Sequence, residues 1–183
     1  IMADDLRGWL KKMEESEQVK TLEGADWDVE IGTIEALNSK NPNGPALLFD
    51  KIKGYPPGFK VLCSSILTPW RTAVTLGLKP GTTRELLFQM RQKIADWDNN
   101  LEKFKPKMVK AGPVMENVKS GKDINLLQFP APKWRAKDGG RYIGTFHGVI
   151  TKDPETGWEN VGVYRQMLHD KSSTSMSVAQ GQH

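Results

Sequence analysis

The sequence predicts an α+β protein in which an amino-terminal α/β unit precedes the opening strands of a β-rich domain. Two observations lead to this prediction. Before Pro106, apolar residues recur mainly at helical spacing, whereas β-branched and aromatic residues dominate after residue 142. The segment around Pro113 is the expected linker. The first domain is therefore predicted over residues 1–115 and the beginning of the second over residues 116–183.

Three helices are expected in the first domain. The first follows a cap at Asp4 or Asp5, and its apolar face, at i, i+3, i+4 and i+7, comprises Leu6, Trp9, Leu10 and Met13. A shorter helix over residues 31–37 follows a cap at Asp28. The longest begins at a capping box of Thr82 and Glu85 and runs to about Phe104. The face of this helix that should be buried comprises Leu86, Ile94, Trp97 and Leu101.

Strands are expected on both sides of the linker. Two short apolar runs, at residues 46–49 and 59–63, are separated by a turn rich in glycine and proline. The segment Asp153-Pro154-Glu155-Thr156-Gly157 favours a tight turn, which predicts a β-hairpin around it. The strands expected in the second domain lie at residues 142–151, 158–169 and 175–179, with a further turn at 170–174.

The composition excludes several classes of protein. The net charge of +4 comes without a basic stripe, which argues against nucleic-acid binding. No apolar run approaches the roughly 20 residues that cross a bilayer, and the acidic start of the sequence is not a secretory signal. Cys63 is the single cysteine, which excludes an internal disulfide and a cysteine-cluster metal site. A cytoplasmic location is the expectation that follows.

Common catalytic motifs are missing from the sequence. It contains no H-E-x-x-H, G-x-S-x-G or G-x-x-x-x-G-K-[ST] pattern. The glycine-rich segment 138–144 lacks both G-x-G-x-x-G and a following helix, so it does not predict a dinucleotide site. By pattern alone, His147 and His169 are interpreted as partly exposed strand residues. These patterns leave the chemistry undetermined.

Four segments in the last third of the chain share their order and spacing with one family. They are residues 129–134 (FPAPKW), 138–145 (DGGRYIGT), 153–165 (DPETGWENVGVYR) and 181–183 (GQH). In these segments the chain resembles the UbiD family of decarboxylases. One departure is Arg135, where many members carry histidine. The resemblance implies that the β-rich domain is the start of a split β-barrel that binds prenylated flavin mononucleotide (FMN).

The resemblance also implies a set of binding residues. Asn160, through its side-chain carbonyl, and His183, through its imidazole, are expected to bind Mn²⁺ or Mg²⁺. Trp158 is expected to offer its backbone carbonyl to K⁺. The residues expected to line the flavin are Asn160, Val161, Gly162, Val163, Tyr164, Arg165, Gln182 and His183.

Arg165 is the catalytic residue that the resemblance implies. Its planar guanidinium suits two-point contact with a substrate carboxylate. The expected reaction is reversible, non-oxidative decarboxylation of an aromatic or α,β-unsaturated carboxylic acid. Asn160 and Arg165 have opposite strand parity, so they either serve different sides of the cofactor or are separated by a bulge at Gly162. Without the resemblance, Asn160 reads as a polar strand or turn residue and Arg165 as a surface partner of an acidic side chain.

The resemblance further implies that a third metal ligand and two catalytic glutamates lie beyond His183. The 183-residue chain alone is therefore expected to be inactive. The expected partners are a flavin prenyltransferase that supplies the cofactor and further copies of the chain in a dimer or hexamer. Two alternatives stay open: a redox flavoprotein of split-barrel type that uses ordinary FMN, and a non-catalytic binding or assembly module.

Overall fold

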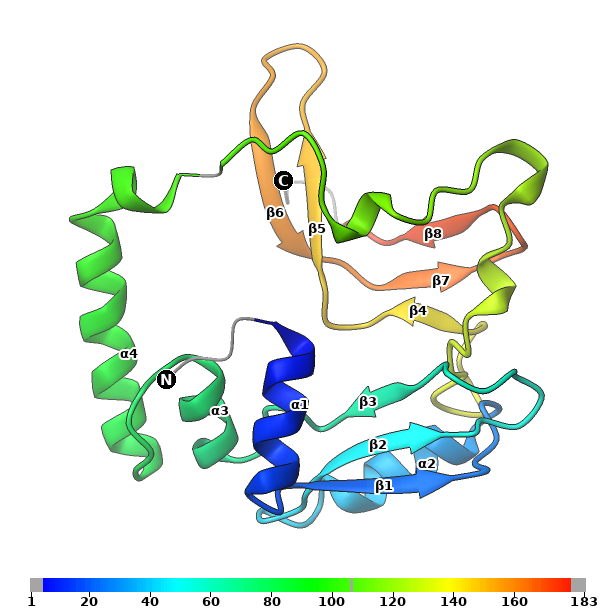
Figure 1. Cartoon of the computed structure of the whole chain (residues 1–183), viewed down its shortest axis with the longest axis horizontal. Coiled ribbons are helices and arrows are strands. Elements are labelled where there is room, and N and C mark those ends of the chain that lie inside the picture. Colours follow the sequence, from blue (N-terminus) through cyan, green and yellow to red (C-terminus); the bar gives the residue numbers. More distant parts are fainter. Residues whose placement is uncertain (1–4, 106, 179–183) are drawn as a thin grey trace. The chain divides into compact units, whose positions relative to one another are not determined.

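The computed structural model of the chain describes residues 5–105 and 107–178. Helices and strands alternate in the first part of the chain, and strands dominate after residue 142, which confirms the α+β prediction (Figure 1). The helices are α1 (Leu6–Glu15), α2 (Glu30–Asn38), α3 (Pro69–Thr75) and α4 (Thr83–Asp98). The strands are β1 (Val19–Glu23), β2 (Ala46–Asp50), β3 (Val61–Cys63), β4 (Tyr142–Gly144), β5 (Gly148–Lys152), β6 (Glu159–Val163), β7 (Gln166–Leu168) and β8 (Thr174–Met176).

The chain forms two compact units, each assembled from separated segments. The first comprises the described residues up to Lys20, Asn38–Leu47 and the described part of Leu62–Ser120. The second comprises Thr21–Leu37, Leu48–Val61 and the described residues from Gly121 onward. The domain division expected at residue 115 stays a prediction.

The core of the first unit forms around α1. The Asp5 carboxylate caps this helix by accepting a hydrogen bond of 2.7 Å from the Gly8 amide. The predicted apolar face then buries Trp9 and Met13, at 6% and 0% exposure. The cluster that contains them comprises Trp9, Met13, Ala46 and Val74, packed against Leu10, Val19, Leu62 and Trp70.

Helix α3 was not predicted, although its start carries a local signal. Thr68 caps it through its hydroxyl, and Pro69 occupies the first turn, where a missing amide hydrogen costs nothing. The helix places Arg71 in the core at 0% exposure. One Arg71 guanidinium nitrogen donates to the Gly44 carbonyl at 2.7 Å, and the other donates to the Gln18 side chain at 3.3 Å. Burial lowers the pKa of Arg71, because an apolar environment disfavours its charge.

Helix α4 confirms the predicted start but not the predicted burial. The Thr82 hydroxyl accepts from the Glu85 amide, and the Glu85 carboxylate accepts from the Thr82 amide, so the capping box is present. Of the face expected to be buried, only Leu86 is covered, at 5% exposure, whereas Ile94 is 50% and Leu101 is 63% exposed. Helical spacing identifies an apolar stripe but does not show what covers it. The α-helix also ends at Asp98, and a separate 3₁₀ turn, Leu101–Phe104, follows.

Short antiparallel strands make up most of the regular structure in the later part of the second unit. β4, β7 and β8 form one sheet in the order β4-β7-β8, and β5 pairs with β6 as the predicted hairpin (Figure 1). The Asp153 carboxylate accepts hydrogen bonds from the Thr156 and Glu155 amides in the turn, which lowers the pKa of Asp153. Gly157 closes the turn at a φ of 73°, a conformation that favours glycine. Among the described residues the strands form separate sheets and no closed barrel.

None of the helices in residues 5–105 and 107–178 combines the length and the apolar character needed to cross a bilayer.

Candidate functional site

The β5–β6 hairpin carries most of the predicted site residues in a regular register. Asn160 lies opposite Thr151, and Gly162 lies opposite Val149. The pairing continues without a shift from Glu159 to Val163, so the bulge considered at Gly162 is not present. Side chains therefore alternate between the two faces of β6 as in an ordinary strand.

The two faces of this hairpin differ in character. Asn160 and Gly162 lie on the half-buried face of β6. The opposite face exposes Val161 and Val163 at 69% and 58%, and the paired strand adds Ile150 at 74%. The exposed apolar face can pack against an apolar surface, and the half-buried face carries the Asn160 amide as its polar group.

Arg165 lies outside the regular strand, so the alternation of side chains along β6 does not determine which face it occupies. β6 ends at Val163 and β7 begins at Gln166, so Tyr164 and Arg165 form a two-residue break between the strands. The Arg165 side chain is exposed. None of the ion pairs within residues 5–105 and 107–178 includes Arg165. An exposed guanidinium in this position can bind an anionic group of a ligand.

Tyr164 contacts both Gly162 and Asn160, which sequence reasoning did not predict. Tyr164 is 8% exposed. A Cβ atom added to Gly162 would lie 2.5 Å from the Tyr164 Cε2 atom and 2.8 Å from its hydroxyl oxygen. The Asn160 side-chain nitrogen donates to that hydroxyl at 3.5 Å. Alternation along a strand would place residues 160, 162 and 164 on the same face. Tyr164 lies just after the end of β6, however, so alternation alone does not predict that its ring packs on Gly162.

Trp158 precedes β6 and closes the hairpin turn. Its backbone carbonyl accepts a hydrogen bond of 2.9 Å from the Asp153 amide, and its side chain is 57% exposed. A carbonyl oxygen has two lone pairs, so this bond still leaves one for a cation. The K⁺ contact of Trp158 stays a prediction, and the hydrogen bond from Asp153 does not prevent it.

The loop between β4 and β5 carries a second polar pair that the sequence did not reveal. The His147 Nε2 atom lies 3.2 Å from the Gln166 Oε1 atom. The imidazole ring occupies the space next to Gly144, where an added Cβ would lie 2.0 Å from the His147 Cε1 atom. Within the described residues, the buried Nδ1 atom of His147 has no hydrogen-bond partner. If Nε2 donates to Gln166, Nδ1 is an acceptor.

Arg141 fixes the segment that leads into β4. Its Nε atom donates to the Ala131 carbonyl at 2.8 Å, and one terminal nitrogen donates to the Phe129 carbonyl at 3.0 Å and also to the Tyr55 hydroxyl. The guanidinium also lies over the Trp27 ring. Arg141 thus ties two stretches of the chain that carry the family resemblance, the proline-rich segment and the DGGRYIGT segment, to the body of the second unit.

Two of the predicted ligands, Gln182 and His183, lie outside the described residues. Within the described part of the chain, no group of three or more histidine, cysteine, aspartate or glutamate side chains could hold a metal ion. Of the two residues predicted to bind Mn²⁺ or Mg²⁺, Asn160 lies within the described residues. Its side chain lies 3.5 Å from the Tyr164 hydroxyl, and its carbonyl oxygen is the atom of the amide that can bind a hard cation.

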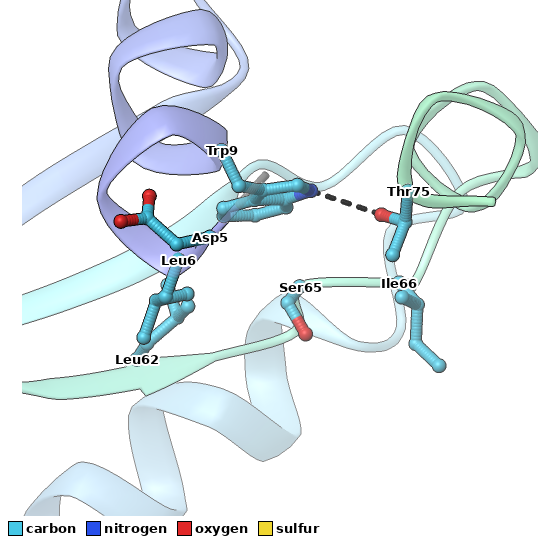
Figure 2. A pocket seen from close by; sticks show the side chains of 7 residues that line it. All are labelled: Asp5, Leu6, Trp9, Leu62, Ser65, Ile66 and Thr75. Carbon is cyan, nitrogen blue, oxygen red and sulfur yellow. Dashed lines mark hydrogen bonds between the residues drawn. The ribbon is translucent and has the colours of Figure 1, made fainter. Parts of the chain in front are cut away.

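A cavity in the first unit contains none of the predicted site residues. Its volume is about 320 Å³, and its lining comprises Asp5, Leu6, Trp9, Leu62, Ser65, Ile66 and Thr75. Trp9 points from α1 toward Thr75, and the indole nitrogen donates to the Thr75 hydroxyl at 2.9 Å (Figure 2). The cavity is mostly apolar and open, and it offers no cluster of ionisable groups for catalysis.

Comparison with known proteins assigns the chain to a family. Residues 10–90 match the 3-octaprenyl-4-hydroxybenzoate carboxy-lyase N-terminal domain. Residues 107–183 match the 3-octaprenyl-4-hydroxybenzoate carboxy-lyase Rift-related domain. The chain belongs to the UbiD family. Both expected parts of the UbiD sequence pattern are thus present in the expected order.

Among curated relatives, the chain is 37% identical to an uncharacterized protein of Aquifex aeolicus, over 94% of this chain and 37% of that protein. It is 30% identical to the pyrrole-2-carboxylic acid decarboxylase of Pseudomonas aeruginosa, over 86% of this chain and 32% of that enzyme. The chain thus spans about a third of the length of these two relatives.

Solved UbiD-class structures share the fold. The closed form of the vanillic acid decarboxylase of Sedimentibacter hydroxybenzoicus superposes with a TM-score of 0.81 at 29% identity, covering 98% of this chain and 38% of that one. An evolved dimeric form of HmfF from Pelotomaculum thermopropionicum, in complex with prFMN, gives a TM-score of 0.72 at 24% identity over 96% of this chain and 38% of that one. At 24% identity, the likeness to HmfF shows a shared fold alone.

Proposed function

We propose that the chain is the amino-terminal part of a carboxy-lyase that removes CO₂ from an aromatic or α,β-unsaturated carboxylic acid with the help of prenylated FMN. Membership in the UbiD family and the decarboxylase activities of its relatives support this proposal. The observation that carries it is the position of Arg165, which is exposed directly after the strand that bears Asn160.

The residues present fit the proposed cofactor and metal. Asn160 would offer its side-chain carbonyl oxygen, a hard donor, and His183 would supply an imidazole to the same Mn²⁺ or Mg²⁺. Trp158 would supply its carbonyl to K⁺. The flavin would be lined by residues 160–165 together with Gln182 and His183. When bound, prenylated FMN supplies an electron-accepting ring for the electron pair that CO₂ leaves behind.

Arg165 has a defined task in this reaction. The carboxylate of the substrate must be held in place until its bond to the substrate carbon breaks, the electron pair stays with that carbon, and a proton replaces CO₂. A planar guanidinium holds a carboxylate at two points and stays charged throughout. Correct orientation of this kind lowers the barrier by several kcal/mol, about 7–11 in the best cases.

The wider assembly follows from the same proposal. A flavin prenyltransferase would supply the cofactor, and the full-length protein would form a homo-oligomer, either a dimer or a hexamer. The third metal ligand and the two catalytic glutamates would come from the part of the polypeptide that follows His183. On this proposal the 183-residue chain alone has no turnover.

The experiment that tests the proposed function uses Arg165→Ala and Arg165→Lys in the full-length protein. We expect turnover to fall at least about 100-fold in Arg165→Ala, as when a preorganised donor at a reacting group is removed. Arg165→Lys should recover little, because an ammonium group cannot make the two-point contact. Arg84→Ala, which removes an exposed arginine from α4, is the control. Turnover within a few-fold of the parent in Arg165→Ala, at full flavin occupancy, would exclude Arg165 from the mechanism.

A second measurement separates the proposal from a redox flavoprotein. The visible spectrum of the purified holoprotein and the mass of the released cofactor distinguish prenylated FMN from ordinary FMN. Ordinary FMN with reductase activity would contradict the decarboxylase assignment.

A further inference from the structure

Arg165 lies where the chain passes from the β5–β6 hairpin into the β4-β7-β8 sheet (Figure 1). The pair of the hairpin nearest to it is Gly148 with Val163. The pair of the sheet nearest to it is Gly144 with Gln166. The two backbone ladders thus end on either side of Arg165, and its placement depends on what the neighbouring side chains contact.

His147 holds the side of this junction that leads into the sheet. Its Nε2 atom lies 3.2 Å from the Gln166 Oε1 atom. An imidazole nitrogen and a carboxamide can each donate or accept, so the contact holds for either assignment of the proton and of the amide. The His147 ring also fills the space beside Gly144, where an added Cβ would lie 2.0 Å from its Cε1 atom and 2.5 Å from its Nδ1 atom. The side chain that binds Gln166 is therefore itself supported by the backbone of β4.

Tyr164 holds the side that leads out of the hairpin. Its ring packs on Gly162, where an added Cβ would lie 2.5 Å from the Cε2 atom, and it is 8% exposed. Arg165 is thus flanked by two residues, each held against a glycine of a different sheet, while its own side chain is exposed. A group that is held in place before its ligand arrives loses less freedom on binding, so this arrangement suits an arginine that binds a ligand.

We propose that His147 is a positioning residue that places Arg165 for its contact with the substrate carboxylate, acting through Gln166 and supported at Gly144. This inference rests on the proposed function, because it takes Arg165 as the group that binds the carboxylate. A two-point contact needs both guanidinium donors in place at once, so it is more sensitive to a shift of the backbone than attraction to a single charge is. His147 would not need to touch the substrate, the flavin or the metal.

The test measures the binding of benzoate and cinnamate, with benzamide as the uncharged analogue, to the full-length protein saturated with FMN, by isothermal titration calorimetry. Gln166→Met keeps the length of the side chain and removes its amide. We expect it to weaken binding of both acids about 5-fold, a part of the roughly 10–100-fold loss expected when Arg165 is removed entirely. The affinity for benzamide should stay within about two-fold. Gln92→Met, at an exposed position of α4, is the control.

Two results with Gln166→Met overturn the proposal. One is an unchanged affinity for both acids. The other is an equal loss for benzamide, because a change that does not depend on the carboxylate is a general change of the site.

A pair of glycines tests the support at β4. Gly144→Ala should weaken binding of the acids about as much as Gln166→Met, because its Cβ would displace the His147 ring. Gly148→Ala is the matched control, since the nearest atom to its Cβ would be the Val161 Cγ1 atom at 3.5 Å, an ordinary van der Waals contact. In a His147→Ala background, Gly144→Ala should cost less than about two-fold, because the space is then empty. A similar loss in both backgrounds overturns the proposal.

Failure of the proposed function gives a different pattern. If the parent binds neither acid, or if Arg165→Ala binds both as tightly as the parent, then Arg165 is not the carboxylate site and the proposed function is wrong. If Arg165→Ala loses the acids while Gln166→Met does not, only the positioning role of His147 is wrong. In an Arg165→Ala background, Gln166→Met should change the affinity for the acids by less than about two-fold. A further loss of about 5-fold there would mean that the contact acts on another group, which overturns the proposal.

Discussion

The guanidinium carbon of Arg141 lies 4.1 Å from the centre of the Trp27 ring. The same guanidinium donates to the Ala131 and Phe129 carbonyls and to the Tyr55 hydroxyl. A cation over an aromatic ring contributes about 0.5–2 kcal/mol, and a hydrogen bond from a charged group about 1.5–3 kcal/mol. Arg141 therefore connects three parts of the second unit, at Trp27, Tyr55 and the segment of Phe129 and Ala131.

We expect Arg141→Ala to lower the free energy of unfolding by about 2–4 kcal/mol, because it leaves two carbonyls without their donor and removes the contact with Trp27. Arg141→Lys should recover less than half of this loss, since an ammonium cannot reach both carbonyls and lie flat on the ring. Urea unfolding followed by tryptophan fluorescence measures the change. Arg7→Ala, at an exposed position of α1, is the control and should change stability by less than about 0.5 kcal/mol.

Leu86 and Leu101 provide a matched pair for the stripe of α4 and the 3₁₀ turn that follows it. Leu86 is 5% exposed and Leu101 is 63% exposed. Leu86→Ala should cost about 2–5 kcal/mol of unfolding free energy, because it leaves a cavity. Leu101→Ala should cost less than about 1 kcal/mol in this chain, because its side chain is mostly exposed. Equal costs in thermal or urea unfolding would show that Leu101 is covered by another part of the protein or by a second copy.

The Asp170 carboxyl should titrate far below an ordinary aspartate. The Ser173 hydroxyl, then the Ser172 amide, hydrogen-bonds to its ionised form and lowers its pKa from 3.8 to about 2. Because the folded-state pKa is depressed, Asp170 stabilises the turn fully above pH 3.8, and this contribution is lost as the pH falls through about 2. The carboxyl ¹³C shift measures the titration directly. Ser173→Ala should raise the pKa toward 3.8, whereas Ser177→Ala should not change it.

Asn160→Ala and His183→Ala in the full-length protein should each release manganese and weaken flavin retention together, because the ion is expected to link the protein to the flavin phosphate. Metal analysis and the flavin absorbance after gel filtration measure both quantities on one sample. Asn43→Ala, at an exposed loop position, is the control. Full metal and flavin content in either variant would remove that residue from the ligand set.

Local rules made part of the fold predictable from the sequence. The capping box at Thr82 and the turn at Asp153 depend on residues a few positions apart, and both form as predicted. Helix α3 was missed, although Thr68 as its cap and Pro69 in its first turn are a local signal of a helix start. The exposure of Ile94 could not be predicted, because it depends on which surface the chain brings to α4 and not on helical spacing.

The site residues stay predictions, and the geometry around them was only partly predictable. The strand that carries Asn160 follows from β-branched composition, and the structure bears it out. The end of β6 at Val163 could not be predicted, so the parity of Arg165 was argued for a strand that does not continue that far. The contact of Tyr164 with Gly162 could not be predicted either, because it depends on the backbone conformation directly after β6.

The packing of Tyr164 on Gly162 also restricts how this protein can evolve. A side chain at position 162 cannot be accepted while the tyrosine ring occupies that space. A mutation at 162 alone is therefore selected against, whereas replacement of Tyr164 by a small residue opens the space and makes a later serine or alanine at 162 tolerable. Within the family the two positions should covary, with glycine beside tyrosine in one group of descendants and two small residues in another, and the order of substitutions between the groups should begin at 164.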